Sequence, residues 1–234
     1  MHAVLADGFR LDYESRGQGR PVVLIHGLSG SREMWKHQVP ALAGRFRVIT
    51  LDLRGHGQSD KPPGPYSVPM FAEDVLGLLD HLGIETAVLV GLSMGGGTVQ
   101  TFALAYPQRV RALGLISTSS EFVPAVRERF YEWADVAERD GMAQLAESLV
   151  ASWLAPGFRE RHAEEFQLNV RTTLTTDPKA FAASARANAV RNWTAELGRI
   201  TCPVLFVGGE LDAAGPVRNA ETYRRHLRDL EVHI

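Results

Sequence analysis

The feature that most constrains this chain is a serine flanked by glycines, between a strand pattern and a helix pattern. An apolar, β-branched run at residues 86–90 leads into Gly91-Leu92-Ser93-Met94-Gly95, and a helical pattern begins at once. This is the G-x-S-x-G nucleophile elbow, a sharp turn that exposes the serine above the end of a strand. Side chains at Gly91 and Gly95 would collide with neighbouring backbone, so the turn needs glycine there. The pattern predicts Ser93 as a nucleophile beside the electropositive end of a helix.

A glycine-rich turn can be no more than a tight connection, but a second motif upstream favours the nucleophile. The apolar strand pattern at residues 21–25 ends in His26-Gly27-Leu28. Enzymes with a serine elbow form an oxyanion hole from two backbone N–H groups, one after such a strand and one after the nucleophile. We therefore expect the N–H groups of Leu28 and Met94 to be the donors, with the backbone turning at Gly27. His26 is expected to fix loops rather than to transfer protons.

The composition argues against several classes of protein. Lys and Arg number 25 against 27 Asp and Glu, so no basic surface for nucleic acid is predicted. The single cysteine, Cys202, cannot form an internal disulfide, which is typical of the reducing cytoplasm. No stretch approaches the roughly 18 apolar residues of a membrane span, and the N-terminus resembles neither a signal peptide nor an anchor. We predict a cytoplasmic protein with no membrane association.

Strand and helix patterns alternate along most of the chain, which predicts an α/β fold with a mostly parallel sheet flanked by helices. Two departures from this alternation are expected. Asp7-Gly8 predicts a hairpin with a two-residue turn near the N-terminus. Residues 117–192 read as helical throughout, with no convincing strand. We interpret residues 117–192 as an all-helical cap inserted into a core formed by residues 1–116 and 193–234. A helix is also expected at residues 33–44.

Aromatic and basic residues in or beside the predicted cap are candidates for contact with a substrate. Trp133, Trp153 and Trp193 could line the underside of the cap, although aromatic residues at helical spacing more often belong to a core. Three arginines could hold a substrate carboxylate, but a solvated helix face accounts for each more simply; they are Arg171, Arg186 and Arg191.

A carboxylate follows the strand pattern at residues 203–207. The turn Gly208-Gly209-Glu210-Leu211-Asp212 places Asp212 at the same carboxyl edge of the predicted sheet as Ser93. Asp212 could orient a histidine by accepting its ring N–H, which stabilises the imidazolium formed during catalysis. Glu210 and Glu121 are the alternatives for this acid.

Four motifs in order resemble those of the α/β-hydrolase superfamily, and the resemblance covers essentially the whole chain. They are the His26-Gly27 strand end, the charged loop at residues 52–60, the elbow at 91–95 and the turn at 208–212. Within the superfamily, the elbow is similar to those of small carboxylesterases and 3-oxoadipate enol-lactonases. The resemblance implies the α/β-hydrolase fold and a Ser–Asp–His triad, to which Ser93 and Asp212 correspond.

The triad histidine has no counterpart in this sequence. In the superfamily it follows the last strand, and here residues 230–234 are the expected last strand. His233 would lie within that strand, with its side chain fixed to one sheet face and out of reach of the nucleophile. We therefore expect a C-terminally truncated member whose histidine lies beyond Ile234, with impaired catalysis. The final helix would also be missing, which predicts uncovered apolar sheet surface.

Together these features predict a serine hydrolase that cleaves a small-molecule carboxylic ester or lactone through an acyl-enzyme on Ser93. No metal or cofactor is implied, because metal ligands do not cluster and no G-x-G-x-x-G follows the first buried strand. Two alternatives remain open. The same elbow could serve a carbon–carbon bond hydrolase or a perhydrolase, or the chain could be an inactive ligand-binding scaffold. A dehalogenase is disfavoured because it would carry Asp at position 93.

Overall fold

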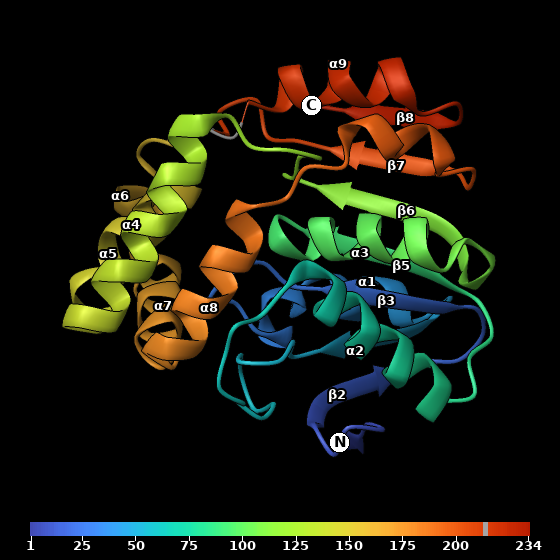
Figure 1. The fold of residues 1–234 in the computed structure, drawn as a ribbon, viewed down its shortest axis with the longest axis horizontal. Coiled ribbons are helices and arrows are strands. Elements are labelled where there is room, and N and C mark those ends of the chain that lie inside the picture. Colours follow the sequence, from blue (N-terminus) through green and yellow to red (C-terminus); the bar gives the residue numbers. More distant parts are fainter. Residues whose placement is uncertain (213–214) are drawn as a thin grey trace.

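The computed structural model describes residues 1–212 and 215–234 and shows one twisted sheet with helices on both faces (Figure 1). Within these residues the sheet has eight strands in the order β1-β2-β4-β3-β5-β6-β7-β8. The β1–β2 and β2–β4 pairs are antiparallel, and the other five pairs are parallel. The strands are β1 (His2–Val4), β2 (Arg10–Arg16), β3 (Pro21–Ile25), β4 (Arg47–Leu51), β5 (Ala87–Leu92), β6 (Val110–Ile116), β7 (Val204–Val207) and β8 (Leu230–His233). The predicted mostly parallel sheet is confirmed.

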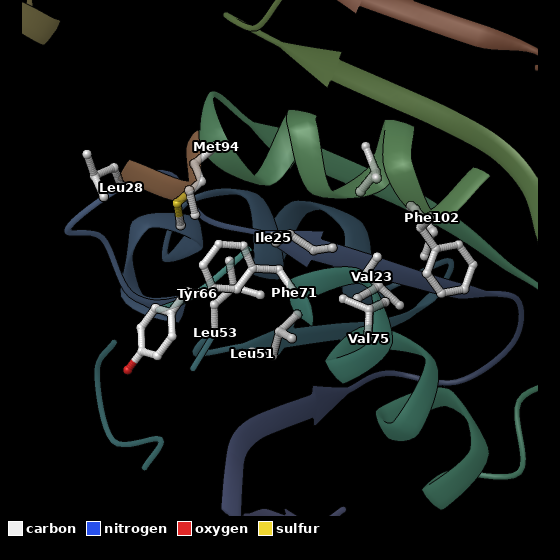
Figure 2. Packing of buried hydrophobic residues seen from close by; sticks show 14 of the residues in the cluster. Val23, Ile25, Leu28, Leu51, Leu53, Tyr66, Phe71, Val75, Met94 and Phe102 are labelled. Carbon is white, nitrogen blue, oxygen red and sulfur yellow. The ribbon is translucent and has the colours of Figure 1, made fainter. Parts of the chain in front are cut away.

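Helices on one face of the sheet form the main core. On this face, Phe71 of α2 and Phe102 of α3 are fully buried in one apolar cluster (Figure 2). Tyr223 of α9 is fully buried in the same cluster. The sheet contributes alternate side chains such as Ile25 and Phe206 to the same cluster, because successive strand residues point to opposite faces. The described helices are α1 (Gln38–Ala43), α2 (Val68–His81), α3 (Met94–Ala105), α4 (Pro124–Asp140), α5 (Ala146–Trp153), α6 (Phe158–Arg161), α7 (Ala163–Leu174), α8 (Pro178–Ala189) and α9 (Pro216–His226).

The opposite face of the sheet is covered more thinly. Trp35 and the short helix α1 pack over β3 and β4, where Val22, Leu24 and Val48 are buried. Over β5 to β7 the apolar residues of this face are only partly buried, and Leu205 is 39% exposed. Apolar sheet surface is therefore left accessible on the α1 side.

Two local predictions were wrong, and each has a local cause. The N-terminal hairpin has a three-residue loop, because Leu5 pairs with Phe9 through a 2.9 Å N–H···O bond and Gly8 adopts φ +81°. This is the left-handed bulge that a glycine permits after a tight turn. The helix expected at residues 33–44 is split into a 3₁₀ turn (Arg32–Trp35) and α1. Pro40 explains the break, since a continuous helix would place its ring against the carbonyl of Lys36.

Residues 124–189 form a group of helices beside the carboxyl edge of the sheet, in yellow-green to orange in Figure 1. α4 and α8 pack side by side, and Val150, Phe166 and Val170 form a small separate core among α5 and α7. An isolated bridge between Glu121 and Asn192 joins the two ends of the group. The stretch is helical as predicted. None of the helices described in this structure has the length and hydropathy needed to cross a bilayer.

Candidate active site

The elbow is built where β5 ends and α3 begins. Ser93 has φ 52° and ψ −106°, and its N–H donates to the Ile116 carbonyl of the neighbouring strand at 2.9 Å. A Cβ at Gly91 would overlap the Gly95 carbonyl, and one at Gly95 would lie 2.6 Å from the His26 carbonyl oxygen. The backbone can make this turn only because both positions lack a side chain. A positive φ in a residue other than glycine is strained, and such strain often accompanies function.

Three donors hold the backbone carbonyl of Ser93. The N–H of Gly97 donates at 3.1 Å, the hydroxyl of Thr118 at 2.7 Å and Nη1 of Arg191 at 3.2 Å. The side chain is different, because Ser93 Oγ makes no hydrogen bond within residues 1–212 and 215–234, and the residue is half-buried. The turn is thus fixed through its backbone while the hydroxyl stays available.

The strand end after β3 lies directly against the elbow. A Cβ placed at Gly27 would be 3.4 Å from Ser93 Cβ, and the N–H of Gly30 donates to the Gly27 carbonyl at 3.1 Å to close a turn. The side chains of Leu28 and Met94 are buried in the main core and lie at one end of the group drawn in Figure 2. In the part of the chain that the structure describes, neither residue's N–H donates a hydrogen bond to another group. These two N–H groups are the geometric candidates for an oxyanion hole.

Two buried histidines stabilise the loops around this turn. Nε2 of His26 accepts from the Leu53 N–H at 3.0 Å, so the ring proton resides on Nδ1, which donates to the Gly27 carbonyl at 2.7 Å. Burial lowers the pKa of His26 to about 4. Burial, together with the nearby His26 ring, lowers the pKa of His56 to about 3, and its Nδ1 lies 2.9 Å from the Arg54 carbonyl. Both rings are therefore neutral at pH 7, and His26 fixes loops as expected.

The parallel register brings the ends of β7 and β8 to the edge of the sheet at which β5 ends before Ser93. Leu92, Ile116, Val207 and His233 are aligned in one row across β5, β6, β7 and β8. Asp212 follows β7 in a turn in which its N–H donates to the Gly209 carbonyl at 2.9 Å. The chain therefore leaves β7 at the level of Ser93, two strands away, and Asp212 lies five residues after Val207 on this side of the sheet.

His233 lies in the same row, but its side chain is exposed and contacts Glu231. Its Nε2 lies 2.6 Å from Glu231 Oε1, two residues earlier on the same exposed face of β8. Among the described residues no histidine hydrogen-bonds to Ser93. The alternative acids have other environments, since Glu121 forms the bridge with Asn192 and Glu210 is exposed.

The aromatic candidates lie in three different settings. Trp193 donates from Nε1 to Gln100 Oε1 at 3.1 Å, and its ring lies against Gly97 in the first turn of α3. Trp133 packs edge-on against Phe130 with ring centroids 5.2 Å apart, whereas Trp153 is 39% exposed on α5.

The arginine predictions divide in the same way. Arg186 pairs with Asp135 and Glu138 near the surface, and Arg171 is exposed, as expected for a solvated helix face. For Arg191 that prediction was wrong, because this residue is only 2% exposed. It follows α8, where the chain returns to the sheet. No periodicity marks this position, so sequence reasoning had no means of finding it.

Comparison with known proteins agrees with this geometry. A family model for the alpha/beta hydrolase fold matches residues 20–234. This chain is an α/β hydrolase. It is 30% identical to 3-oxoadipate enol-lactonase 2 of Acinetobacter baylyi over 95% of this chain and 83% of that protein.

Solved structures of other α/β hydrolases superpose closely on this one. The enol-lactonase of Burkholderia xenovorans has a TM-score of 0.94 at 29% identity, over 99% of this chain and 90% of that one. A thermophilic esterase from Thermogutta terrifontis has a TM-score of 0.92 at 32% identity, over 99% and 88% of the two chains. The α/β-hydrolase fold predicted from the motifs is confirmed.

Proposed function

We propose that this α/β hydrolase cleaves a carboxylic ester or a lactone through an acyl-enzyme on Ser93. The observation that carries the proposal is the strained elbow, which holds Ser93 by its backbone and leaves Oγ without a partner among the described residues. Similarity to an enol-lactonase and an esterase supports this choice of substrate class. Elbow geometry of this kind is costly to form and is used to present a nucleophile.

The chemistry follows from the groups around the turn. Ser93 Oγ attacks the carbonyl carbon, and the N–H groups of Leu28 and Met94 hydrogen-bond to the oxygen that becomes negatively charged. The carbon–oxygen bond of the ester or lactone then breaks, leaving the acyl group on Ser93 and releasing an alcohol. In a lactone the alcohol stays attached to the acyl group. Water attacks the acyl-enzyme in the same way and restores the serine.

A histidine is needed to take the Ser93 proton and pass it to the leaving oxygen. We place this histidine after Ile234, because the chain leaves β8 at the edge that carries Ser93 and Asp212. Asp212 would accept its ring N–H. His26 and His56 are unsuited to the role, since both are buried with their pKa values lowered.

We further propose that residues 117–192 act as a cap on a core of residues 1–116 and 193–234. The helices of this stretch lie beside the carboxyl edge, and the Glu121–Asn192 bridge joins its two ends close to the elbow. Trp133 and Trp153 of the cap, and Trp193 directly after it, remain the candidates for contact with a substrate.

Hydrolysis of p-nitrophenyl acetate and of a simple aromatic lactone tests the proposal. Ser93→Ala should abolish turnover, and Ser152→Ala should not, because the Ser152 hydroxyl donates to the Leu149 carbonyl within α5. A chain extended past Ile234 by a segment that carries a histidine should be faster than the 234-residue chain, and Asp212→Asn should lower the rate of the extended chain. Equal turnover by wild type and Ser93→Ala would refute the nucleophile. Saturable ligand binding without turnover by either length of chain would favour a scaffold.

A further inference from the structure

Arg191 is a buried cation beside the nucleophile turn. Its Nη1 lies 3.2 Å from the Ser93 carbonyl oxygen and 3.2 Å from Thr118 Oγ1, which itself donates to the same carbonyl at 2.7 Å. The guanidinium and the hydroxyl therefore hold one backbone oxygen together. That oxygen belongs to Ser93, whose backbone is strained by its positive φ.

The charge of Arg191 is not balanced by a carboxylate among the described residues. No carboxylate pairs with it within residues 1–212 and 215–234, and its Nε is buried without a partner. The Phe122 ring lies 3.8 Å from the guanidinium carbon and gives a weak cation–π contact. Burial lowers the pKa of Arg191 to about 9, so the group is still charged at pH 7. Burying an unpaired charge is costly, and such departures from packing rules concentrate at functional sites.

A purely structural anchor does not explain the charge. Next to Arg191 the chain is already tied to the core by neutral groups. Trp193 Nε1 and the Tyr223 hydroxyl both donate to Gln100 Oε1 at 3.1 Å. This network joins the exit of the helical group to α3 and α9. A cation beside the electropositive start of α3 is also unfavourable for the helix.

We propose that Arg191 is a positioning residue for Ser93, which holds the elbow in its strained conformation and directs a buried positive charge at the nucleophile. The charge favours negative charge on Ser93 Oγ and on the oxyanion, because charges interact strongly where water is excluded. The catalytic half of this proposal, that the charge assists Ser93 as a nucleophile, rests on the proposed function. The conformational half, that Arg191 holds the elbow in its strained conformation, does not.

Kinetics of Arg191→Met, Arg191→Lys and the control Arg171→Met test the catalytic half. Arg171 is an exposed arginine on α7, in the same group of helices, and among the described residues it does not hydrogen-bond to Ser93. With p-nitrophenyl acetate, Arg191→Met should lower kcat about 10- to 100-fold, as the loss of a group that orients a catalytic residue does. This is less than the roughly 100- to 1,000-fold loss expected for a direct oxyanion-hole donor, because Arg191 acts through the Ser93 backbone. KM should change much less, since Arg191 is too buried to touch a substrate. Arg191→Lys should recover part of kcat, and Arg171→Met should match wild type.

Amide hydrogen exchange of Gly97 tests the conformational half without any turnover. The Gly97 N–H donates to the Ser93 carbonyl that Arg191 holds, so it should exchange faster in Arg191→Met and not in Arg171→Met. If Arg191→Met does not fold, Arg191→Gln, which keeps donors but no charge, takes its place in both assays. Unchanged Gly97 exchange together with unchanged kcat would overturn the proposal. Equal turnover by wild type and Ser93→Ala would instead overturn the proposed function, and Gly97 exchange would still decide the positioning role.

Discussion

Gly95→Ala is the substitution for which the structure gives the clearest expected effect. The added Cβ would lie 2.6 Å from the His26 carbonyl oxygen and 2.8 Å from the Ile25 carbonyl carbon. These are backbone atoms at the end of a central strand, so no side chain can rotate away. The first turn of α3 must therefore move off the end of β3.

The size of the effect follows from two opposing terms. Overpacking of this kind costs roughly 1–3 kcal/mol, while alanine is favoured over glycine in a helix by about 1 kcal/mol. Because the contacts are with backbone atoms that cannot rotate away, the overpacking cost lies in the upper part of that range, at about 2–3 kcal/mol. The net destabilisation is then about 1–2 kcal/mol, which for a chain of this size lowers Tm by about 2–8 °C. Activity should fall further than stability, because the displacement separates the Leu28 N–H from the Met94 N–H.

Differential scanning calorimetry and ester hydrolysis of the same preparations give both quantities. Gly44→Ala is the matched control, since a Cβ there meets no atom within 4 Å and φ is −69°. Its Tm should equal or exceed that of wild type. An unchanged or raised Tm in Gly95→Ala would refute the steric account of the elbow.

Two further predictions concern buried ionisable side chains. Arg54→Met should lower the free energy of unfolding, measured in urea, by about 3–5 kcal/mol, because it leaves the Asp74 carboxylate buried without the guanidinium that contacts it at 2.5 and 2.6 Å. The double variant Arg54→Met/Asp74→Leu should be markedly more stable than Arg54→Met. Equal stability of the two variants would contradict this reasoning. Stability should also fall as pH drops from about 7 toward 4, because the lowered pKa values of His26 and His56 mean that below about pH 6.5 the unfolded chain binds more protons than the folded one. The loss is about 2 kcal/mol per histidine by pH 5, so His56→Asn should flatten the pH dependence of unfolding while the exposed His162→Gln should not.

The predictions that succeeded depended on short stretches of sequence. The elbow could be recognised because the turn brings the backbone of residues 91 and 95 so close together that only glycine fits there. The strands could be recognised because a parallel strand buried on both faces is a continuous apolar run. The predictions of the hairpin loop and of the helix at residues 33–44 were wrong at this same local scale, because Gly8 adopts a positive φ and Pro40 interrupts the helix.

The sequence by itself therefore determined the fold, the elbow and the strand ends that carry Leu28 and Asp212, since each depends on neighbours along the chain. Only the tertiary structure decided which polar groups are buried and what they face. Arg191 lies 98 residues from Ser93 in sequence, yet its guanidinium holds the Ser93 carbonyl. Burial and charge environment are set by segments that meet only in the folded protein, so no periodicity in the sequence could reveal them.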